Sequence, residues 1–124
     1  MKIKFTVPGV PVPYQRVVPK QGQAPYNPPK YREYRKLVRL FAMRAMEGQP
    51  YTEKPVHLKI TVYHTKKAAS KQSGDIDNHI KAVLDSLNKV VFKDDGQVIR
   101  INVDKIKNPQ DPHIEVWVSD EFNE

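Results

Sequence analysis

The sequence contains no cysteine, which excludes disulfides, thiolate metal sites and a cysteine nucleophile. Its five glycines are scattered, so it has no glycine-rich phosphate-binding loop. No apolar run approaches the length of a membrane span, and residues 1–7 are too short and too regularly alternating for a signal peptide. We therefore expect a soluble cytoplasmic protein, and the length suits one domain over residues 1–124.

Acidic residues are nearly missing from the first part of the chain. Residues 1–46 hold ten Lys or Arg and one acid, Glu33, whereas residues 47–124 hold eleven basic and thirteen acidic residues. These charges of +9 and −2 give the net charge of +7. A basic half is typical of a polyanion-binding protein, but a basic protein without that role can have the same composition, so charge alone does not decide between them.

Alternation and helical spacing predict about four strands and two helices. The expected strands are residues 2–7, 55–64, 97–107 and 112–118, and the expected helices are residues 30–47 and 76–90. Seven of the eleven prolines fall within residues 8–29, which predicts a long loop after the first strand. The order β-α-β-α-β-β predicts an α+β fold, a mixed α/β layer with both helices packed on the sheet.

The acids that do occur gather at the two ends of the second predicted helix. Asp75 and Asp77 lie at its start, and Asp94 and Asp95 lie just after its end. Carboxylate oxygens are the ligands that Mg²⁺ prefers, and a bound ion can activate water against a phosphodiester. The two pairs are far apart along the helix, so only a return of the chain can bring Asp95 near the first pair.

Within the same helix, Asp77, Lys81 and Asp85 follow one another at intervals of four residues. This spacing places them on one polar ridge beside the apolar face. Lys81 is therefore placed to orient a carboxylate ligand or to contact a phosphate oxygen.

Each acid also has a purely structural explanation. The acids at the helix start can act as N-caps, and those before Gly96 fit a turn. For Asp85 we favour an ion pair with Lys81 or Lys89 on a solvated helix face. His79, beside the acidic motif, is expected to be a surface histidine. These explanations leave open why the acids concentrate around one helix of a basic chain.

The segment from Asp75 to Asn88, followed by the segment from Phe92 to Val98, resembles the RusA family of Holliday junction resolvases. The family pattern is roughly D-x-D-N, a lysine three residues later, D-x-L, and then D-D followed by Gln and a β-branched residue. Every element of this pattern is matched. The proline-rich basic stretch from Pro11 to Arg16 resembles the family more loosely, so the resemblance covers nearly the whole chain.

The resemblance implies a homodimeric, Mg²⁺-dependent endonuclease that resolves four-way DNA junctions in recombination and repair, with Mn²⁺ as a substitute and no organic cofactor. It implies that Asp75, Asp77 and Asp95 bind the metal and that Lys81 completes the catalytic set. Asn78, Asp85 and Asp94 match supporting positions. The residues expected to contact DNA are Arg16, Lys20, Arg32, Arg35, Lys36, Lys66, Lys67 and Lys71. Two alternatives stay open, a non-catalytic junction-binding module and a metal-dependent nuclease for other branched DNA.

Overall fold

The computed structural model describes residues 1–121 and contains four strands and two α-helices in the predicted order. The elements are β1 (Lys2–Pro8), α1 (Pro29–Met46), β2 (Val56–His64), α2 (Ile76–Leu87), β3 (Val98–Lys107) and β4 (His113–Ser119). Two short 3-10 helices, η1 (Lys71–Ser73) and η2 (Asp95–Gln97), flank α2. The predicted α+β fold is therefore confirmed.

The four strands form one mixed sheet in the order β1-β4-β2-β3. β4 lies between β1 and β2 and is antiparallel to both, with Val116 opposite Phe5 on one side and Ile60 on the other. β3 pairs in parallel with β2 at the edge of the sheet. Parallel neighbours need a crossover connection, and α2 with its flanking loops supplies it.

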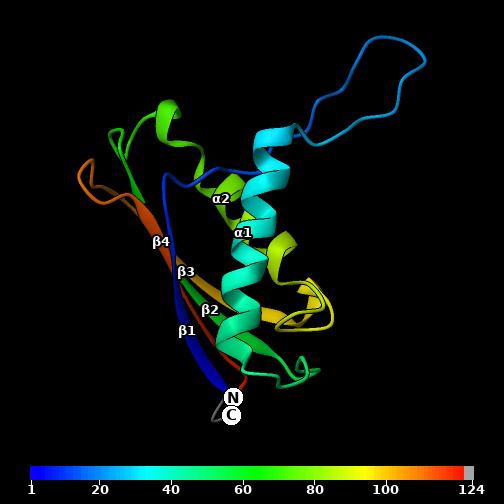
Figure 1. Cartoon of the computed structure of the whole chain (residues 1–124), viewed down its shortest axis with the longest axis vertical. Helices are drawn as coiled ribbons and strands as arrows, with labels where there is room; N and C mark the ends of the chain where they lie inside the picture. Colours follow the sequence, from blue (N-terminus) through cyan, green and yellow to red (C-terminus); the bar gives the residue numbers. More distant parts are fainter. Residues whose placement is uncertain (122–124) are drawn as a thin grey trace.

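Both helices pack on the same face of the sheet (Figure 1). Strict alternation buries every second residue of β1 and β2, because one set of side chains points towards the helices. Tyr31 and Val38 of α1 and Val83 and Leu87 of α2 are buried in the same core. This one-sided packing fixes α2 over the sheet. None of the helices within residues 1–121 combines the length and the apolar character that a membrane span requires.

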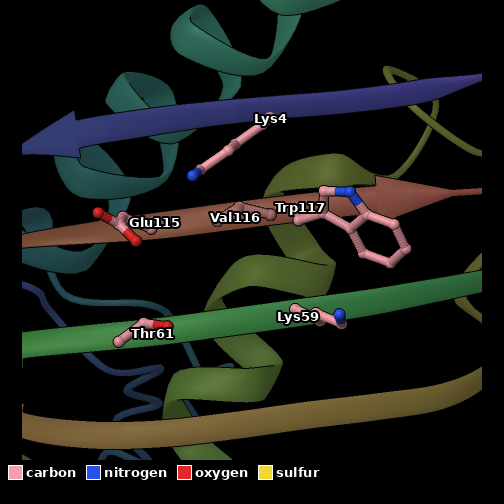
Figure 2. A pocket seen from close by; sticks show the side chains of 6 residues that line it. All are labelled: Lys4, Lys59, Thr61, Glu115, Val116 and Trp117. Carbon is pink, nitrogen blue, oxygen red and sulfur yellow. The ribbon is translucent and has the colours of Figure 1, made fainter.

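The other face of the sheet is polar, with the helices behind it in Figure 2. Lys4, Lys59, Thr61, Glu115 and Trp117 line a shallow hollow across three of its strands. The Lys59 ammonium lies 4.9 Å from the centre of the Trp117 ring, which is close enough for a cation–π contact. Alternating positive and negative side chains make this face unlike a uniform phosphate-binding surface.

α2 ends at Leu87, three residues earlier than the predicted helix 76–90. Lys89 adopts a left-handed backbone conformation with φ of 63°, and its N–H donates to Phe92 O at 2.6 Å. This tight turn reverses the chain and buries Val91 and Phe92 in the core. The prediction placed the end of the helix too late because these apolar residues continue the helical spacing. In the structure they are buried by the reversal, which returns the chain towards α2.

The predicted proline-rich loop contains no helix or named strand. Within it, residues 15–27 form an arm that projects from the body beside the start of α1 (Figure 1). Val17 N–H donates to Tyr26 O at 2.7 Å, and Tyr26 N–H donates to Val17 O at 3.0 Å. This pair of hydrogen bonds ties the two sides of the arm together near its base.

Two buried tyrosines of α1 differ in the surroundings of their hydroxyl groups. The Tyr31 hydroxyl donates to Asp85 Oδ2 of α2 at 2.6 Å, which links the two helices. Burial raises the pKa of Tyr31, and Asp85 raises it further, so the hydroxyl keeps the proton that it donates. Burial also raises the pKa of Tyr34, but the Tyr34 hydroxyl has no hydrogen-bond partner within residues 1–121.

We predict that Tyr34→Phe leaves the free energy of unfolding unchanged or raises it by about 1 kcal/mol, because it removes a buried hydroxyl without a partner. Tyr31→Phe is the matched control and should lower the same free energy by about 1 kcal/mol, because Asp85 loses a donor. Urea unfolding at pH 7 measures both changes. A larger loss for Tyr34→Phe than for Tyr31→Phe would contradict this account.

Candidate acidic site on the crossover between β2 and β3

The first turn of α2 presents two exposed carboxylates. Asp75 occupies the N-cap position with an extended backbone, and its carbonyl accepts the N–H groups of Asn78 and His79, each at 3.1 Å. Its side chain makes no capping hydrogen bond, although an N-cap aspartate usually does. Asp77 follows within the first turn and is also exposed. The backbone of Asp75 therefore starts the helix while its carboxylate stays free.

The chain just before Asp75 is closely packed. Gly74 has φ of +85°, and a Cβ at this position would lie 2.7 Å from His79 Nε2 and 2.9 Å from Pro13 Cγ. His79 Nε2 lies 2.6 Å from the Ser73 carbonyl, which makes it the donor. His79 is 2 % exposed, so the prediction of a surface histidine is wrong. The buried His79 ring occupies the space beside Gly74 that a Cβ at that position would otherwise fill.

Asp95 and Lys81 line the same hollow, together with Tyr14, Asp85 and Asn88. The turn after α2 returns Asp95 to the side of the helix that carries Lys81, but Asp75 and Asp77 do not line this hollow. The Lys81 ammonium lies 6.0 Å from the centre of the Tyr14 ring. Tyr14 N–H also donates to Asn78 O at 2.9 Å, so the base of the arm is tied to the first turn of α2.

Asp85 binds α1 rather than its own helix. Its Oδ2 accepts from the Tyr31 hydroxyl at 2.6 Å and from Arg35 Nη1 at 2.9 Å. The predicted ion pair with Lys81 or Lys89 is therefore wrong. The spacing along α2 permitted that pair, but a partly buried cation and hydroxyl on the neighbouring helix offer a drier and more fixed partner.

Asp94 has a local structural role. Its Oδ2 accepts from Gly96 N–H at 2.9 Å, and Gln97 Oε1 accepts from Asp94 N–H at 2.9 Å, forming a capping box at η2. Gln97 also donates to the carbonyls of Thr52 and Lys54. These bonds hold the turn that presents Asp95, so Asp94 supports the position of its neighbour.

The three acids that the resemblance assigns to a metal have no competing partner. Asp75, Asp77 and Asp95 are exposed, and they form no hydrogen bond or ion pair through their side chains within residues 1–121. Hard carboxylate oxygens suit Mg²⁺. Across these residues, however, no three His, Asp or Glu side chains are grouped closely enough to hold a metal ion. The donor chemistry fits Mg²⁺, whereas the spacing does not form a closed three-ligand site.

The predicted DNA-binding residues lie on three segments. Arg16 and Lys20 are exposed on the arm, and Arg32 and Lys36 are exposed on α1. The exposed lysines of the connection between β2 and α2 are Lys66, Lys67 and Lys71. Arg35 is engaged by Asp85, and Lys36 lies 3.4 Å from Glu33. Arg35 and Lys36 of α1 thus have acidic partners. The basic side chains of the arm and of the connection have none within residues 1–121.

Sequence reasoning missed Lys105, which contacts the start of the site from β3. Its ammonium donates to Gly74 O at 2.6 Å and to Ser73 Oγ at 3.1 Å. The alternation of the strand indicates that Lys105 is unusual. It shares one side of β3 with Ile101 and Val103, where an apolar residue is expected.

Comparison with known proteins gives the family of the chain. The family model for endodeoxyribonuclease RusA matches residues 8–119, which include the arm, both helices and all of the acids described above. The chain belongs to the RusA endodeoxyribonuclease family. It is also 31 % identical over 137 aligned positions to the uncharacterized protein YqaN of Bacillus subtilis strain 168, covering 94 % of each chain. Membership of the RusA family gives the chain a coarse function, that of a nuclease acting on DNA.

Two buried histidines near the site make stability depend on pH. Burial lowers the pKa of His64, and the nearby Lys105 lowers it further. Burial also lowers the pKa of His79, although its hydrogen bond to Ser73 partly offsets this effect. Both rings therefore favour the neutral form in the folded protein, while in the unfolded chain they titrate near the ordinary value of 6.5.

Because the unfolded state binds more protons below pH 6.5, the contribution of these rings is fully present above that pH and is lost as the pH falls below it. We predict a lower melting temperature at pH 5 than at pH 7.5. His64→Asn keeps an acceptor for the Lys66 N–H and should make the fall smaller. Calorimetry across this pH range measures the effect, and an equal fall in the variant would rule out a contribution from His64.

Proposed function

We propose that this member of the RusA family is a Mg²⁺-dependent endodeoxyribonuclease that resolves four-way DNA junctions by paired phosphodiester hydrolysis. The observation that carries the proposal is the difference between the acids around α2. Asp85 and Asp94 are held by the fold, whereas Asp75, Asp77 and Asp95 are exposed and unpaired within the described chain. Three free carboxylates around one helix, in a chain of net charge +7, offer oxygen ligands that suit a bound Mg²⁺.

In this proposal Asp75, Asp77 and Asp95 hold Mg²⁺. Magnesium sites that act on phosphates commonly use one or two carboxylates, with phosphate oxygens and water as the other ligands, so DNA can complete an open donor set. Bound Mg²⁺ supplies an activated water and stabilises charge on the phosphate. Lys81, one helical turn after Asp77, neutralises charge on the phosphate oxygens during hydrolysis. Mn²⁺ offers the same hard-ligand preference and would substitute.

DNA binding would rely on the basic side chains around this site. Arg16 on the arm lines a hollow with Asn78 and Lys81. Lys20 lies on the same arm, Lys66, Lys67 and Lys71 lie before α2, and Arg32 and Lys36 add charge on α1. Arg35 would contribute through its ion pair with Asp85, by fixing α1 against α2. Contacts to phosphate position a substrate and make its binding salt-dependent, but they do not specify its branching.

We propose that a homodimer is the active form, since a junction has approximate two-fold symmetry and a C₂ dimer presents one site to each of two strands. Light scattering should give the mass of two chains for the purified protein, and that of two chains plus one junction for the complex with DNA. A single chain per junction, cutting both strands, would contradict the dimer.

The deciding experiment is cleavage of an end-labelled synthetic four-way junction, with Mg²⁺ or with EDTA. Flap and linear duplex substrates of matched sequence serve as controls. We expect Mg²⁺-dependent, symmetrically paired cuts in the junction and much slower cutting of both controls. Equal cutting of flap and junction would support a nuclease for other branched DNA, and junction binding without cutting under Mg²⁺ or Mn²⁺ would support a non-catalytic binding module.

Asp77→Asn should lower the cleavage rate by more than about 100-fold. Mutating a residue that only supports a metal ligand already lowers metal affinity or activity by about 10–100-fold, and Asp77 is proposed to be a ligand itself. Junction binding in EDTA should stay equal or become tighter, because a negative charge near phosphate has been removed. Asp104→Asn is the matched control, since Asp104 is also exposed and unpaired but lies on β3 opposite Thr61. Normal cleavage by Asp77→Asn would remove Asp77 from the site.

A further inference from the structure

Lys105 occupies a position that the strand pattern assigns to the core. It pairs with the buried Val62 across the parallel β2–β3 ladder and follows Ile101 and Val103 on the helix-facing side of β3. Its charged head reaches past the end of the apolar core to the segment before α2. A lysine on the inner side of a strand is retained only if its ammonium finds oxygen partners.

The partners of Lys105 are backbone and hydroxyl oxygens at the entrance to α2. Its Nζ donates to Gly74 O at 2.6 Å and to Ser73 Oγ at 3.1 Å, and it forms no ion pair within the described residues. The Ser73 hydroxyl in turn donates to the carbonyls of Ala68 and Ser70. One ammonium therefore connects the sheet to the whole turn that leads into Asp75.

The same two residues are held from the helix side as well. His79 Nε2 donates to Ser73 O at 2.6 Å, and Gly74 packs against His79 and Pro13 so closely that a Cβ would overlap both. Asp75, the next residue, has its carbonyl bonded to the first turn of α2. The backbone on both sides of the Asp75 carboxylate is thus fixed by contacts that leave the carboxylate itself free.

This arrangement replaces the usual way of starting a helix. A capping bond from the Asp75 side chain would stabilise α2 by about 1 kcal/mol, but it would turn the carboxylate onto the helix N–H groups. That bond is not made. The two hydrogen bonds from Lys105 hold the helix start from outside, so the carboxylate can point away from the helix.

We propose that Lys105 is a positioning residue for the metal-binding carboxylate of Asp75: by holding the Gly74 carbonyl and the Ser73 hydroxyl, it fixes the peptide from which Asp75 projects. This inference rests on the proposed function, because it presumes that Asp75 binds a divalent cation. It assigns Lys105 no contact with DNA or with the reacting phosphate.

The sign of the effect separates positioning from simple electrostatics. Removing a positive charge near carboxylates should by Coulomb attraction alone tighten cation binding. Loss of a group that orients a ligand should weaken it, by about tenfold or more. The same substitution therefore gives opposite results under the two explanations.

The test compares wild type with Lys105→Met, Lys105→Arg and Lys107→Met. Lys107 lies two residues further along β3 on the same side and is exposed. Its side chain forms no hydrogen bond or ion pair within residues 1–121, so its loss controls for charge and strand context. Mn²⁺ binding without DNA is measured by titration calorimetry. The Mg²⁺ concentration for half-maximal junction cleavage and the melting temperature are measured on the same proteins.

We expect Lys105→Met to raise the Mn²⁺ dissociation constant and the half-maximal Mg²⁺ concentration by about tenfold or more. Lys107→Met should change either value less than about twofold, because it removes charge without a positioning contact. Lys105→Arg, which can still donate to both oxygens, should recover most of the affinity. Saturating Mg²⁺ should restore the cleavage rate of Lys105→Met.

If wild type binds Mn²⁺ and Lys105→Met binds it equally well or more tightly, the positioning role of Lys105 is overturned while the proposed metal site stands. Failure of wild type both to bind Mn²⁺ and to cleave the junction with Mg²⁺ would overturn the proposed metal site and this inference with it. If wild type cleaves but binds no Mn²⁺ without DNA, the half-maximal Mg²⁺ concentration decides by the same criteria. If Lys105→Met does not fold, Lys105→Gln keeps a neutral donor with a shorter reach and is judged by the same criteria. A lower melting temperature with unchanged metal affinity would make Lys105 purely structural.

Discussion

Parallel pairing of β2 with β3 determines where the acidic site lies. Because the two strands run in the same direction, the chain has to return along the sheet between them, and that return carries α2. Asp75 and Asp77 start the helix on this connection, and Asp95 lies in the turn that leads from it into β3. A hairpin in place of the crossover would have no helix to carry Asp75 and Asp77 at its start and Asp95 in the turn after its end. The strand direction is therefore the constraint on which the site depends.

Acids that are close in sequence differ in whether their side chains are hydrogen-bonded. Asp94 caps η2 while Asp95 beside it stays free, and Asp85 joins α2 to α1 while Asp77, two turns earlier, stays free. In each case the bonded acid secures the backbone that carries the unbonded one. The exposed carboxylates are therefore carried on a backbone that is fixed by its own contacts.

Local patterns in the sequence predicted most of the fold, because alternation and helical spacing record which side of each element is buried. The four strands, both helices and the proline-rich loop follow from such patterns. The sequence could not reveal that Arg35 reaches Asp85 fifty residues away, or that His79 fills the space beside Gly74, because these contacts depend on how the elements are stacked. The end of α2 was misplaced for a related reason, since Val91 is buried by the reversal rather than by the helix. The acids and Lys81 were selected from their spacing and from the family pattern. Lys105 was missed because alternation places it on the inner side of β3 but does not show that its ammonium reaches Gly74 and Ser73.

The two outer strands of the sheet bear on how copies of the chain can meet. β1 and β3 form its edges, and both carry exposed cations, Lys2 and Lys4 on one and Arg100 and Lys107 on the other. Charged side chains along an edge oppose the addition of a further strand, because they would be brought beside the like charges of a second edge. Edge-to-edge strand pairing between two copies of this chain is therefore unfavourable. The charged side chains therefore protect the unpaired backbone of both edges against aggregation at high concentration.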